Sequence, residues 1–455
     1  MSRLLVEGGT LLGLTDRADI RPDTDLYAEN GTIRGVGSDA KRLAAVPGEP
    51  VERIPARGKW VLPGFVQAHL HLCQTLLRNG PEGLDLLSWL GSHVWPGEAA
   101  HDPESLSISA RLGLSECLAS GVTAVLDMGT IRHSDALFRA AARSGIRYTG
   151  GNVLMDDPET TPPTLRATAE EGMAETERLR ALWHGRDRGR LRVAVQPRFA
   201  VTSTEKLLRA AAEYSAAHDL VLHTHASESR GEIDLVRGRT GLSNIEWLDR
   251  VGLLGPRTCV AHVIFAEPDE WATLARRGST VVHCPSSNMR LSSGVCPVSD
   301  LQAAGVRVAL GSDGAACNDR LDPFAEMRLA TFLPRTRKPP SSLTAFTALR
   351  MATVEGAAAL RLGPAPGLAP GALCDVVLLD PEAGWALPEG WSEEPYGAIV
   401  FAMGRENVFA TIVDGVVRYR TGDATVGGLK PTAAEVRGAV AGMKKRMDRD
   451  GRAGL

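Results

Sequence analysis

The alternation of short apolar runs with helix-like stretches between residues 66 and 313 constrains the fold of this chain most. Stretches with helical periodicity, such as Pro103–Ser120 and Ser203–His218, separate runs that read as buried strands. Eight such units close into a barrel of parallel strands, so the sequence predicts an α/β fold with a (β/α)8 TIM barrel at residues 61–363. The predicted strands are Val66–His71, Thr123–Asp127, Arg147–Met155, Arg192–Phe199, Val221–Glu228, Thr258–Phe265, Thr280–Pro285 and Arg307–Asp313.

Both ends of the chain carry strand patterns of a different kind. Asn30-Gly31 stands between two strand-like runs, which is a strong hairpin signal. Neither end has enough strands for a stable sheet alone, so we expect one β-sandwich built from residues 1–60 and 364–425. The segments with strand patterns are Leu4–Leu14, Asp25–Gly37, Ala372–Asp380 and Val408–Tyr419.

The last segment, residues 426–455, is expected to form a helix. Thr432–Asp448 is amphipathic at the helical period. Such a helix covers the β-sandwich or contacts another subunit.

Composition and charge exclude several classes of protein. With 51 basic and 54 acidic residues the net charge is −3, which gives no cationic surface for nucleic acid. No apolar run approaches the ~18 residues that cross a bilayer, and the N-terminus lacks an apolar signal region. The seven cysteines form no C-x-x-C pair, as in a reducing compartment. We expect a cytoplasmic protein that binds neither nucleic acid nor membrane.

Ionisable side chains gather where the predicted strands end. In a closed barrel these ends meet at one mouth, where catalytic groups are found. Residues i and i+2 of a strand share a face, so His69 and His71 point inward together, close enough to bind one ion. The side chains at the strand ends are His69, His71, Arg198, His225, Glu228, His262, His283 and Asp313.

Three imidazoles and a carboxylate suit a borderline divalent ion such as Zn²⁺ or Fe²⁺. His69, His71 and Asp313 are three of the predicted ligands. Any one of them alone reads more simply as a core histidine or a helix cap, but their placement at separate strand ends favours a metal site. The run HTHASE offers both His223 and His225 as the third imidazole, and spacing alone does not choose between them.

Five segments together resemble the amidohydrolase superfamily: PGFVQAHLHL, HTHASES, VAHVIF, VVHCPSSNMRLSSGVCPV and ALGSDGAACNDRLD. More narrowly, they are similar to the branch that contains methylthioadenosine/S-adenosylhomocysteine deaminases, guanine deaminases and triazine hydrolases. The resemblance implies that His225 completes the metal site with His69, His71 and Asp313. It also implies a homo-oligomer.

The resemblance further implies one metal ion, Zn²⁺ or alternatively Fe²⁺. Relatives with two ions bridge them through a carboxylated lysine at the end of the fourth strand. Here that strand ends in QPRFA, and no lysine occurs between Lys59 and Lys206.

Three residues resemble the catalytic groups of this superfamily. A bound Zn²⁺ lowers the pKa of water to roughly 7, and Asp313 takes the proton of that water and later passes one to ammonia. Glu228 resembles the carboxyl that protonates the ring nitrogen, and His262 the histidine that orients the water. Such groups typically supply ~10²–10⁴-fold each. His283 either packs in the core or supports the ligands from behind.

Five residues are predicted to contact the substrate: Gln74, Trp89, Glu98, Arg198 and Asn318. The Gln74 amide offers a donor and an acceptor, and Arg198 offers a rigid fork of donors. Glu98 resembles the carboxylate that holds ribose hydroxyls in adenosine-type deaminases. Trp89 is placed to wall the pocket, and Asn318 belongs to the GSDGAACNDRLD segment.

The motifs favour two kinds of substrate. GSDGAACNDRLD and HASE are similar to adenosine-type members, whereas H-x-H-x-x-Q and PRF are similar to guanine deaminases. Arg198, where adenosine-type members usually carry histidine, favours a ring with an oxo group.

We predict a zinc-dependent aminohydrolase that deaminates an aminated N-heterocycle. An adenosine-type nucleoside (5′-deoxyadenosine, methylthioadenosine or S-adenosylhomocysteine) is preferred over a guanine-like base, oxopurine or pterin. An s-triazine hydrolase is a further alternative. A metal-free binding homologue is disfavoured, because every predicted ligand is present.

Overall fold

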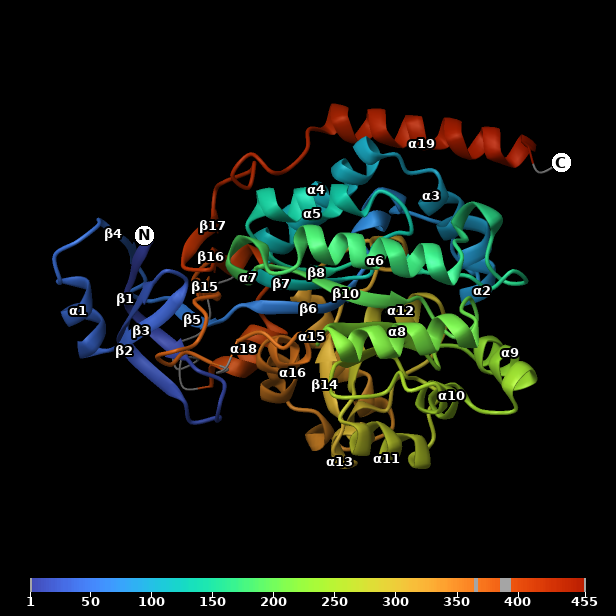
Figure 1. Ribbon diagram of the computed structural model, residues 1–455. Helices are drawn as coiled ribbons and strands as arrows, with labels where there is room; N and C mark the ends of the chain where they lie inside the picture. The colour runs from blue at the N-terminus through green and yellow to red at the C-terminus, as the bar shows by residue number, and fades with distance from the viewer. Residues whose placement is uncertain (1, 364–366, 385–393, 454–455) are drawn as a thin grey trace.

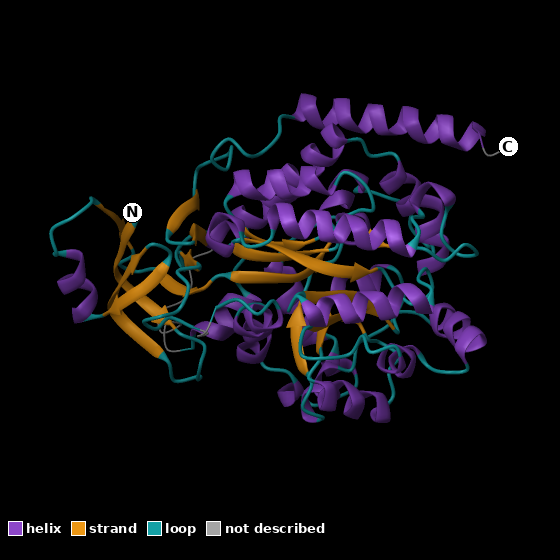
Figure 2. Ribbon diagram, viewed as in Figure 1, coloured by secondary structure: helices purple, strands orange, loops and turns teal. Residues whose placement is uncertain are grey.

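The computed structural model describes residues 2–363, 367–384 and 394–453 (Figure 1). The predicted boundary at residue 364, and the last two residues of the predicted C-terminal helical segment, lie outside the described residues. Figure 2 shows a small strand-rich part beside a larger part in which helices surround strands. The N-terminus lies in the smaller part.

Eight parallel strands form the barrel, in the predicted order. Each pairs with the next along the chain. The short β9 (Val153–Leu154) extends the third strand beside the fourth. The barrel prediction is confirmed. Its strands are β6 (Phe65–Leu70), β7 (Val122–Asp127), β8 (Arg147–Gly150), β10 (Leu191–Pro197), β11 (Val221–Ala226), β12 (Thr258–His262), β13 (Thr280–His283) and β14 (Arg307–Leu310).

Helices cover the outside of the barrel (Figure 2). Several begin where the sequence carries a capping box, in which an N-cap side chain and the third helical residue each accept the other's backbone N–H; Ser229 with Glu232 is one case. The principal helices are α4 (Pro103–Ala119), α5 (Ser134–Ser144), α6 (Ala169–Trp183), α8 (Glu205–Ala217), α9 (Arg230–Thr240), α10 (Asn244–Arg250), α11 (Pro268–Arg277), α12 (Pro285–Arg290), α13 (Val298–Ala303), α14 (Ala315–Asn318), α15 (Pro323–Phe332), α16 (Ala345–Met351), α17 (Val354–Ala359) and α18 (Pro395–Phe401).

Strands from both chain ends form one mixed sheet, which confirms the predicted composite domain. β5 joins the two ends, because it pairs with β1 on one side and β15 on the other. The hairpin at Asn30-Gly31 is present, with φ of 49° and 79° at these residues, as tight hairpin turns require. The strands are β1 (Arg3–Leu12), β2 (Ile20–Glu29), β3 (Thr32–Val36), β4 (Val51–Pro55), β5 (Trp60–Pro63), β15 (Val376–Leu379), β16 (Val408–Val413) and β17 (Val416–Arg420). One core contains apolar side chains from both chain ends, including Leu4, Ile33, Val376 and Ile412.

The C-terminal helix α19 (Ala433–Ala453) lies along α4 and α3 (Trp95–Ala99) of the barrel (Figure 1). Arg446 pairs with Asp102 at 2.7 Å, and Arg111 pairs with Glu435 at 3.0 Å. The expectation that this helix covers the β-sandwich is therefore wrong. Amphipathicity predicts that one face is buried, but not which element buries it. Among the described residues, none of the helices combines the length and the apolar composition that a bilayer crossing requires.

The barrel closes where β14 meets β6. Asp313 donates its backbone N–H to the carbonyl of His69 at 3.1 Å. Gly311 lies in the same seam, and a Cβ atom there would stand 2.7 Å from the His69 carbonyl oxygen. Glycine is required at this position because backbone, not a flexible side chain, occupies the space.

Gly311→Ala should therefore push β14 away from β6 and destabilise the fold by ~1–3 kcal/mol, and it should displace His69. Gly438→Ala is the matched control, because Gly438 is exposed on α19 with nothing near its missing Cβ; it should be neutral or stabilising by up to ~1 kcal/mol. Urea unfolding of both variants measures the difference. Equal stability of the two would contradict this description of the seam.

Candidate metal centre

Four side chains meet at the mouth of the barrel. His69 lies near the end of β6, His71 follows it, His225 lies near the end of β11, and Asp313 follows β14. Asp313 Oδ1 lies 3.2 Å from His69 Nε2 and 3.4 Å from His71 Nε2. His225 Nε2 lies 3.4 Å from His71 Nε2. The structure thus brings all four predicted ligands together, and each is at least nine-tenths buried.

Hydrogen bonds on the far side of the rings set which nitrogen faces the centre. His71 Nδ1 donates to the carbonyl of Met128 at 2.9 Å, and His225 Nδ1 donates to the carbonyl of Arg198 at 2.8 Å. A carbonyl oxygen only accepts, so both rings carry their proton on Nδ1 and present an unprotonated Nε2 to the centre. Metal-binding histidines are typically fixed in this way.

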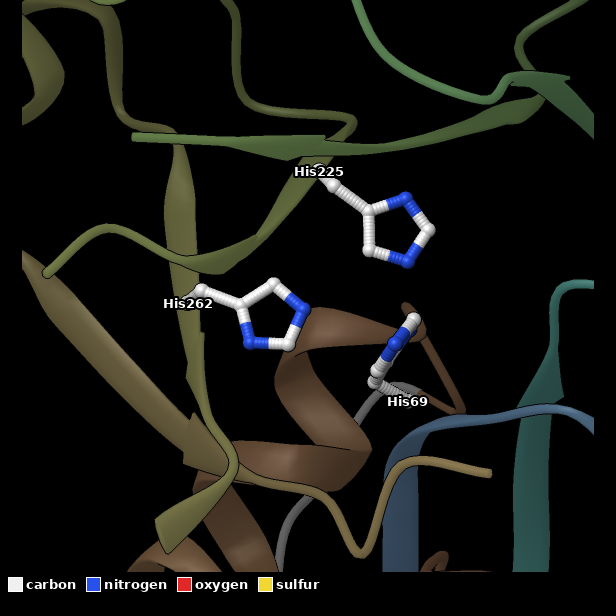
Figure 3. A group of neighbouring side chains, drawn as sticks. All are labelled: His69, His225 and His262. Atoms are coloured by element: carbon white, nitrogen blue, oxygen red, sulfur yellow. The ribbon is translucent and has the colours of Figure 1, made fainter. Parts of the chain in front are cut away.

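The two histidines of β11 occupy different places. His225 joins the cluster, and Figure 3 shows its ring beside those of His69 and His262. His223 instead lies behind His69, with its Nε2 2.8 Å from His69 Nδ1. His223 therefore holds the His69 ring from behind, a contact that the sequence did not predict.

Burial keeps the three imidazoles neutral. It lowers the pKa of His71 to about 3, and the proximity of His69, a second ring that competes for a proton, lowers this pKa as well. Burial likewise lowers the pKa of His69 and His225. Burial alone would raise the pKa of Asp313, but the close contact with His69 Nε2, 3.2 Å away, and the other histidines of the centre hold it well below its usual value. The cluster is therefore one carboxylate among three neutral nitrogen donors.

This donor set fits a divalent metal ion. His69 Nε2 is buried and has no hydrogen-bond partner among the described residues. An unpaired buried polar atom costs ~1–3 kcal/mol, and a cation at the centre would satisfy it. Three imidazole nitrogens and one carboxylate are typical ligands of borderline divalent metals.

One hydroxyl donor and one backbone donor fix the Asp313 carboxylate. Ser287 Oγ donates to Oδ2 at 2.6 Å, and the Gly314 N–H donates to Oδ1 at 2.6 Å. The backbone of Asp313 has a φ of 62°, a left-handed conformation that clusters at functional sites. Ser287 was not predicted, although its place just beyond a strand end, in the run VVHCPSSNM, is a usable signal.

Asn318 supports the turn that carries Asp313. Its Nδ2 donates to the Ser312 carbonyl at 2.7 Å and to Glu326 Oε1 at 2.8 Å. The predicted contact between Asn318 and substrate therefore has no support in the structure, because the amide faces the supporting side of the turn and is not part of the pocket lining. His283, at the end of β13, is also buried outside that lining.

A second pair of ionisable groups faces the centre. Glu228 Oε2 lies 3.3 Å from His262 Nε2, and the far nitrogen of His262 lies 2.9 Å from Asn288 Oδ1. Burial, and then the charge of Asp313, raises the pKa of Glu228 well above its ordinary value. Both effects favour the protonated form of the Glu228 carboxyl. Two carboxyls with opposite shifts in one pocket are typical of an acid and a base with separate tasks.

Three of the predicted substrate-contact residues bind one another. Arg198 grips Glu98 with two hydrogen bonds, Nη1 to Oε2 at 2.7 Å and Nη2 to Oε1 at 3.2 Å. Gln74 Nε2 donates to the same Oε1 at 2.9 Å. All three side chains are buried, and Gln74 and Arg198 line the pocket. The sequence placed these residues near the substrate without predicting that they form one network.

The pocket over this centre is narrow. Trp89, as predicted, lies in its lining, with Leu86 and Leu90 beside it on α2 (Leu86–Trp89) and on the π-helical turn Leu90–Val94. The space between the lining residues that can hold solvent is about 30 Å³, roughly one or two waters. A heterocycle enters only if part of this wall moves.

Residues 60–418 match the sequence profile of the amidohydrolase family. The chain belongs to the amidohydrolase family. This membership is consistent with the barrel, the composite terminal sheet and the cluster of histidines with one aspartate.

Two relatives share much of the sequence of this amidohydrolase. The 5′-deoxyadenosine deaminase of Methanothermobacter thermautotrophicus is 37% identical over 381 residues, which cover 84% of this chain and 86% of the relative. The 5-methylthioadenosine/S-adenosylhomocysteine deaminase of Nitratidesulfovibrio vulgaris is 33% identical over 423 residues, which cover 93% of each.

Solved structures of other proteins share the fold of this chain. A zinc-bound adenosine deaminase from Xanthomonas campestris superimposes with a TM-score of 0.85 at 28% identity, over 98% of each chain. Guanine deaminase from E. coli superimposes with a TM-score of 0.83 at 26% identity, over 93% of this chain and 100% of that one. A triazine hydrolase variant, at 22% identity and a TM-score of 0.85, shows the shared fold alone.

Removal of a ligand should remove the metal. We expect His69→Ala to retain less than about a tenth of the divalent metal bound by the wild type, since even residues behind a ligand change metal affinity ~10–100-fold. His133→Asn is the control, because His133 is exposed and has a left-handed backbone that asparagine tolerates. Elemental analysis of both variants measures the amount of bound metal per chain. Equal metal content would contradict this assignment.

Glu326 should make stability depend on pH. Burial raises its pKa to about 7, and nearby Asp322 raises it further, against the hydrogen bonds from Ser286 and Asn318. An acid whose pKa is raised by folding binds its proton more tightly when folded, so stability falls as pH rises from about 4.5 to about 7.

Glu326→Gln cannot ionise, so its stability relative to wild type should rise by up to about 3 kcal/mol over that interval and then stay constant. Urea unfolding at pH 5 and pH 8 measures this, with the exposed Glu171→Gln as control. Parallel pH dependence of wild type and Glu326→Gln would show that Glu326 does not titrate in this range.

Proposed function

We propose that this amidohydrolase hydrolyses the C–N bond of an amino-substituted N-heterocycle and releases ammonia, with an adenosine-type nucleoside as substrate and one Zn²⁺ as cofactor. The observation that carries this proposal is the position of Glu228, whose Oε2 lies 3.3 Å from His262 Nε2 in the pocket that contains the metal ligands, and burial raises the pKa of this carboxyl. Ring deamination needs such an acid, because the ring nitrogen gains a proton as water adds to the adjacent carbon.

The residues of the centre divide the work. His69, His71, His225 and Asp313 would hold the ion, which supplies Lewis acidity and a nucleophile from water near neutral pH. Asp313, as an ionised carboxylate, accepts the proton of the attacking water. Glu228 donates its proton to the ring nitrogen, and His262 orients the water and the Glu228 carboxyl. Asp313 then returns a proton to the amino group as its C–N bond breaks. The hydroxyl left on the carbon gives its proton to Glu228 as it becomes the carbonyl, which restores both carboxyl groups.

Two relatives favour an adenosine-type substrate, since proteins named as 5′-deoxyadenosine and methylthioadenosine/S-adenosylhomocysteine deaminases are 37% and 33% identical to this chain. Glu98 lies behind the pocket lining, bound to the lining residues Gln74 and Arg198, and we infer that it accepts a ribose hydroxyl once the pocket opens. Glu98 Oε1 accepts hydrogen bonds from Arg198 and Gln74, whereas Oε2 accepts one, from Arg198, among the described residues. We infer that Oε2 takes one hydroxyl, while free N–H groups of Arg198 meet an acceptor on the substrate.

A guanine-like base is the second candidate. Arg198 lines the pocket with a planar set of donors, which suits an exocyclic oxygen. The arginine is bound to Glu98 at the same time, so it reads the substrate from a fixed position. This observation favours an oxopurine over a nucleoside only if the ribose contact to Glu98 is absent.

An ammonia-release assay on the zinc-loaded enzyme distinguishes the candidates. We expect kcat/KM for 5′-deoxyadenosine, methylthioadenosine or S-adenosylhomocysteine to exceed that for guanine, pterins and s-triazines by at least about 10², or ~3 kcal/mol of transition-state binding. A preference for guanine would support the second candidate. Absence of ammonia release from every amino-heterocycle would contradict the proposed reaction.

A further inference from the structure

A buried carboxyl next to the proposed acid has no task in the reaction described above. Glu232 lies on the first turn of α9, four residues beyond Glu228, and none of its surface is exposed. A buried ionisable group is costly unless it is paired or hydrogen-bonded. Its contacts therefore indicate what it does.

Glu232 binds three consecutive backbone N–H groups. Its Oε1 accepts from Ser227 at 3.2 Å. Its Oε2 accepts from Glu228 at 2.8 Å and from Ser229 at 3.5 Å. The side-chain amide of Asn244, on α10, donates to Oε1 as well. The Glu232 carboxyl thus binds all three backbone N–H groups of the turn Ser227–Ser229 that follows β11.

This is more than a helix cap. Elsewhere in the chain, Glu171 on α6 accepts only the N–H of its N-cap residue Thr168, at 2.9 Å, and is exposed. At α9 the equivalent contact, with Ser229, is the longest of the three. The shorter bonds reach back to Ser227 and Glu228, outside the helix. A cap alone does not explain these contacts or the burial.

The turn that Glu232 holds decides where the Glu228 side chain points. Ser227 has a φ of 53°, a left-handed conformation that reverses the chain directly after the strand. The Ser227 carbonyl accepts the N–H groups of Ile264 and Phe265, at 2.9 and 3.1 Å, and so ties this turn to the end of β12. Glu228 and His262 are thereby held at 3.3 Å.

We propose that Glu232 is a positioning residue that fixes the backbone of Glu228, so that its carboxyl stays aimed at His262 and the pocket. This inference rests on the role proposed above for Glu228. Glu232 is not part of the pocket lining, and its hydrogen bonds go to the backbone of Ser227–Ser229 and to the Asn244 amide. It acts by removing alternative conformations of the turn, and misplacement of a catalytic group by about 1 Å can cost ~10²-fold in rate.

A double-mutant cycle on the zinc-loaded enzyme tests the proposal. We expect Glu228→Gln to lower kcat by ~10²–10⁴-fold and Glu232→Gln by ~10–10²-fold, with KM changed less than about threefold. In the Glu228→Gln background, Glu232→Gln should cost little more, because residues that act through one group are non-additive. Glu171→Gln, which alters an ordinary capping box, should leave kcat unchanged.

Each outcome is decisive. Full additivity of Glu228→Gln and Glu232→Gln, or wild-type kcat in Glu232→Gln, would overturn the positioning role while leaving the role of Glu228 intact. Wild-type activity in Glu228→Gln would contradict the proposed function itself, and this inference with it. If Glu232→Gln fails to fold, Glu232→Asp keeps the charge but shortens its reach, and it should show the same loss of kcat and the same non-additivity.

Discussion

The seam between β14 and β6 is the contact on which the centre depends. There the Asp313 backbone donates to the carbonyl of His69, and the Asp313 carboxylate meets the Nε2 atoms of His69 and His71. One carboxylate among neutral imidazoles is a donor set that lacks a positive charge. Closure of the barrel therefore forms a site that favours a cation. The contact that completes the fold also completes this candidate metal site.

The environment divides the carboxyls of the pocket into two kinds. Asp313 is kept ionised by the imidazoles and by Ser287. Burial, and then the like charge of Asp313, raises the pKa of Glu228 well above its ordinary value. Glu98 stays ionised against its own burial because Arg198 grips it with two hydrogen bonds. The proposed base, the proposed acid and the proposed hydroxyl acceptor are thus all carboxyl groups, which differ in burial and in their partners.

The sequence was most informative where structure is local. Strand and helix alternate with clear periods, and the strand ends carry His69, His71, His225 and Asp313 in chain order, so the barrel and the cluster could be predicted. Contacts between distant loops could not. The hydrogen bonds between Arg198 and Glu98 join residues 100 positions apart. The amphipathic pattern of α19 likewise does not specify that this helix packs on α4. Asn318 and His223 sit one layer behind the pocket, a difference that spacing along a strand or loop does not encode.

X-ray diffraction at the zinc absorption edge, from crystals grown without chelator, would show whether the four ligands bind a zinc ion. We predict a single anomalous peak per chain, within about 2.0–2.2 Å of His69 Nε2, His71 Nε2, His225 Nε2 and an oxygen of Asp313. No peak among these four atoms in crystals grown with zinc, or a peak held by other side chains, would contradict it.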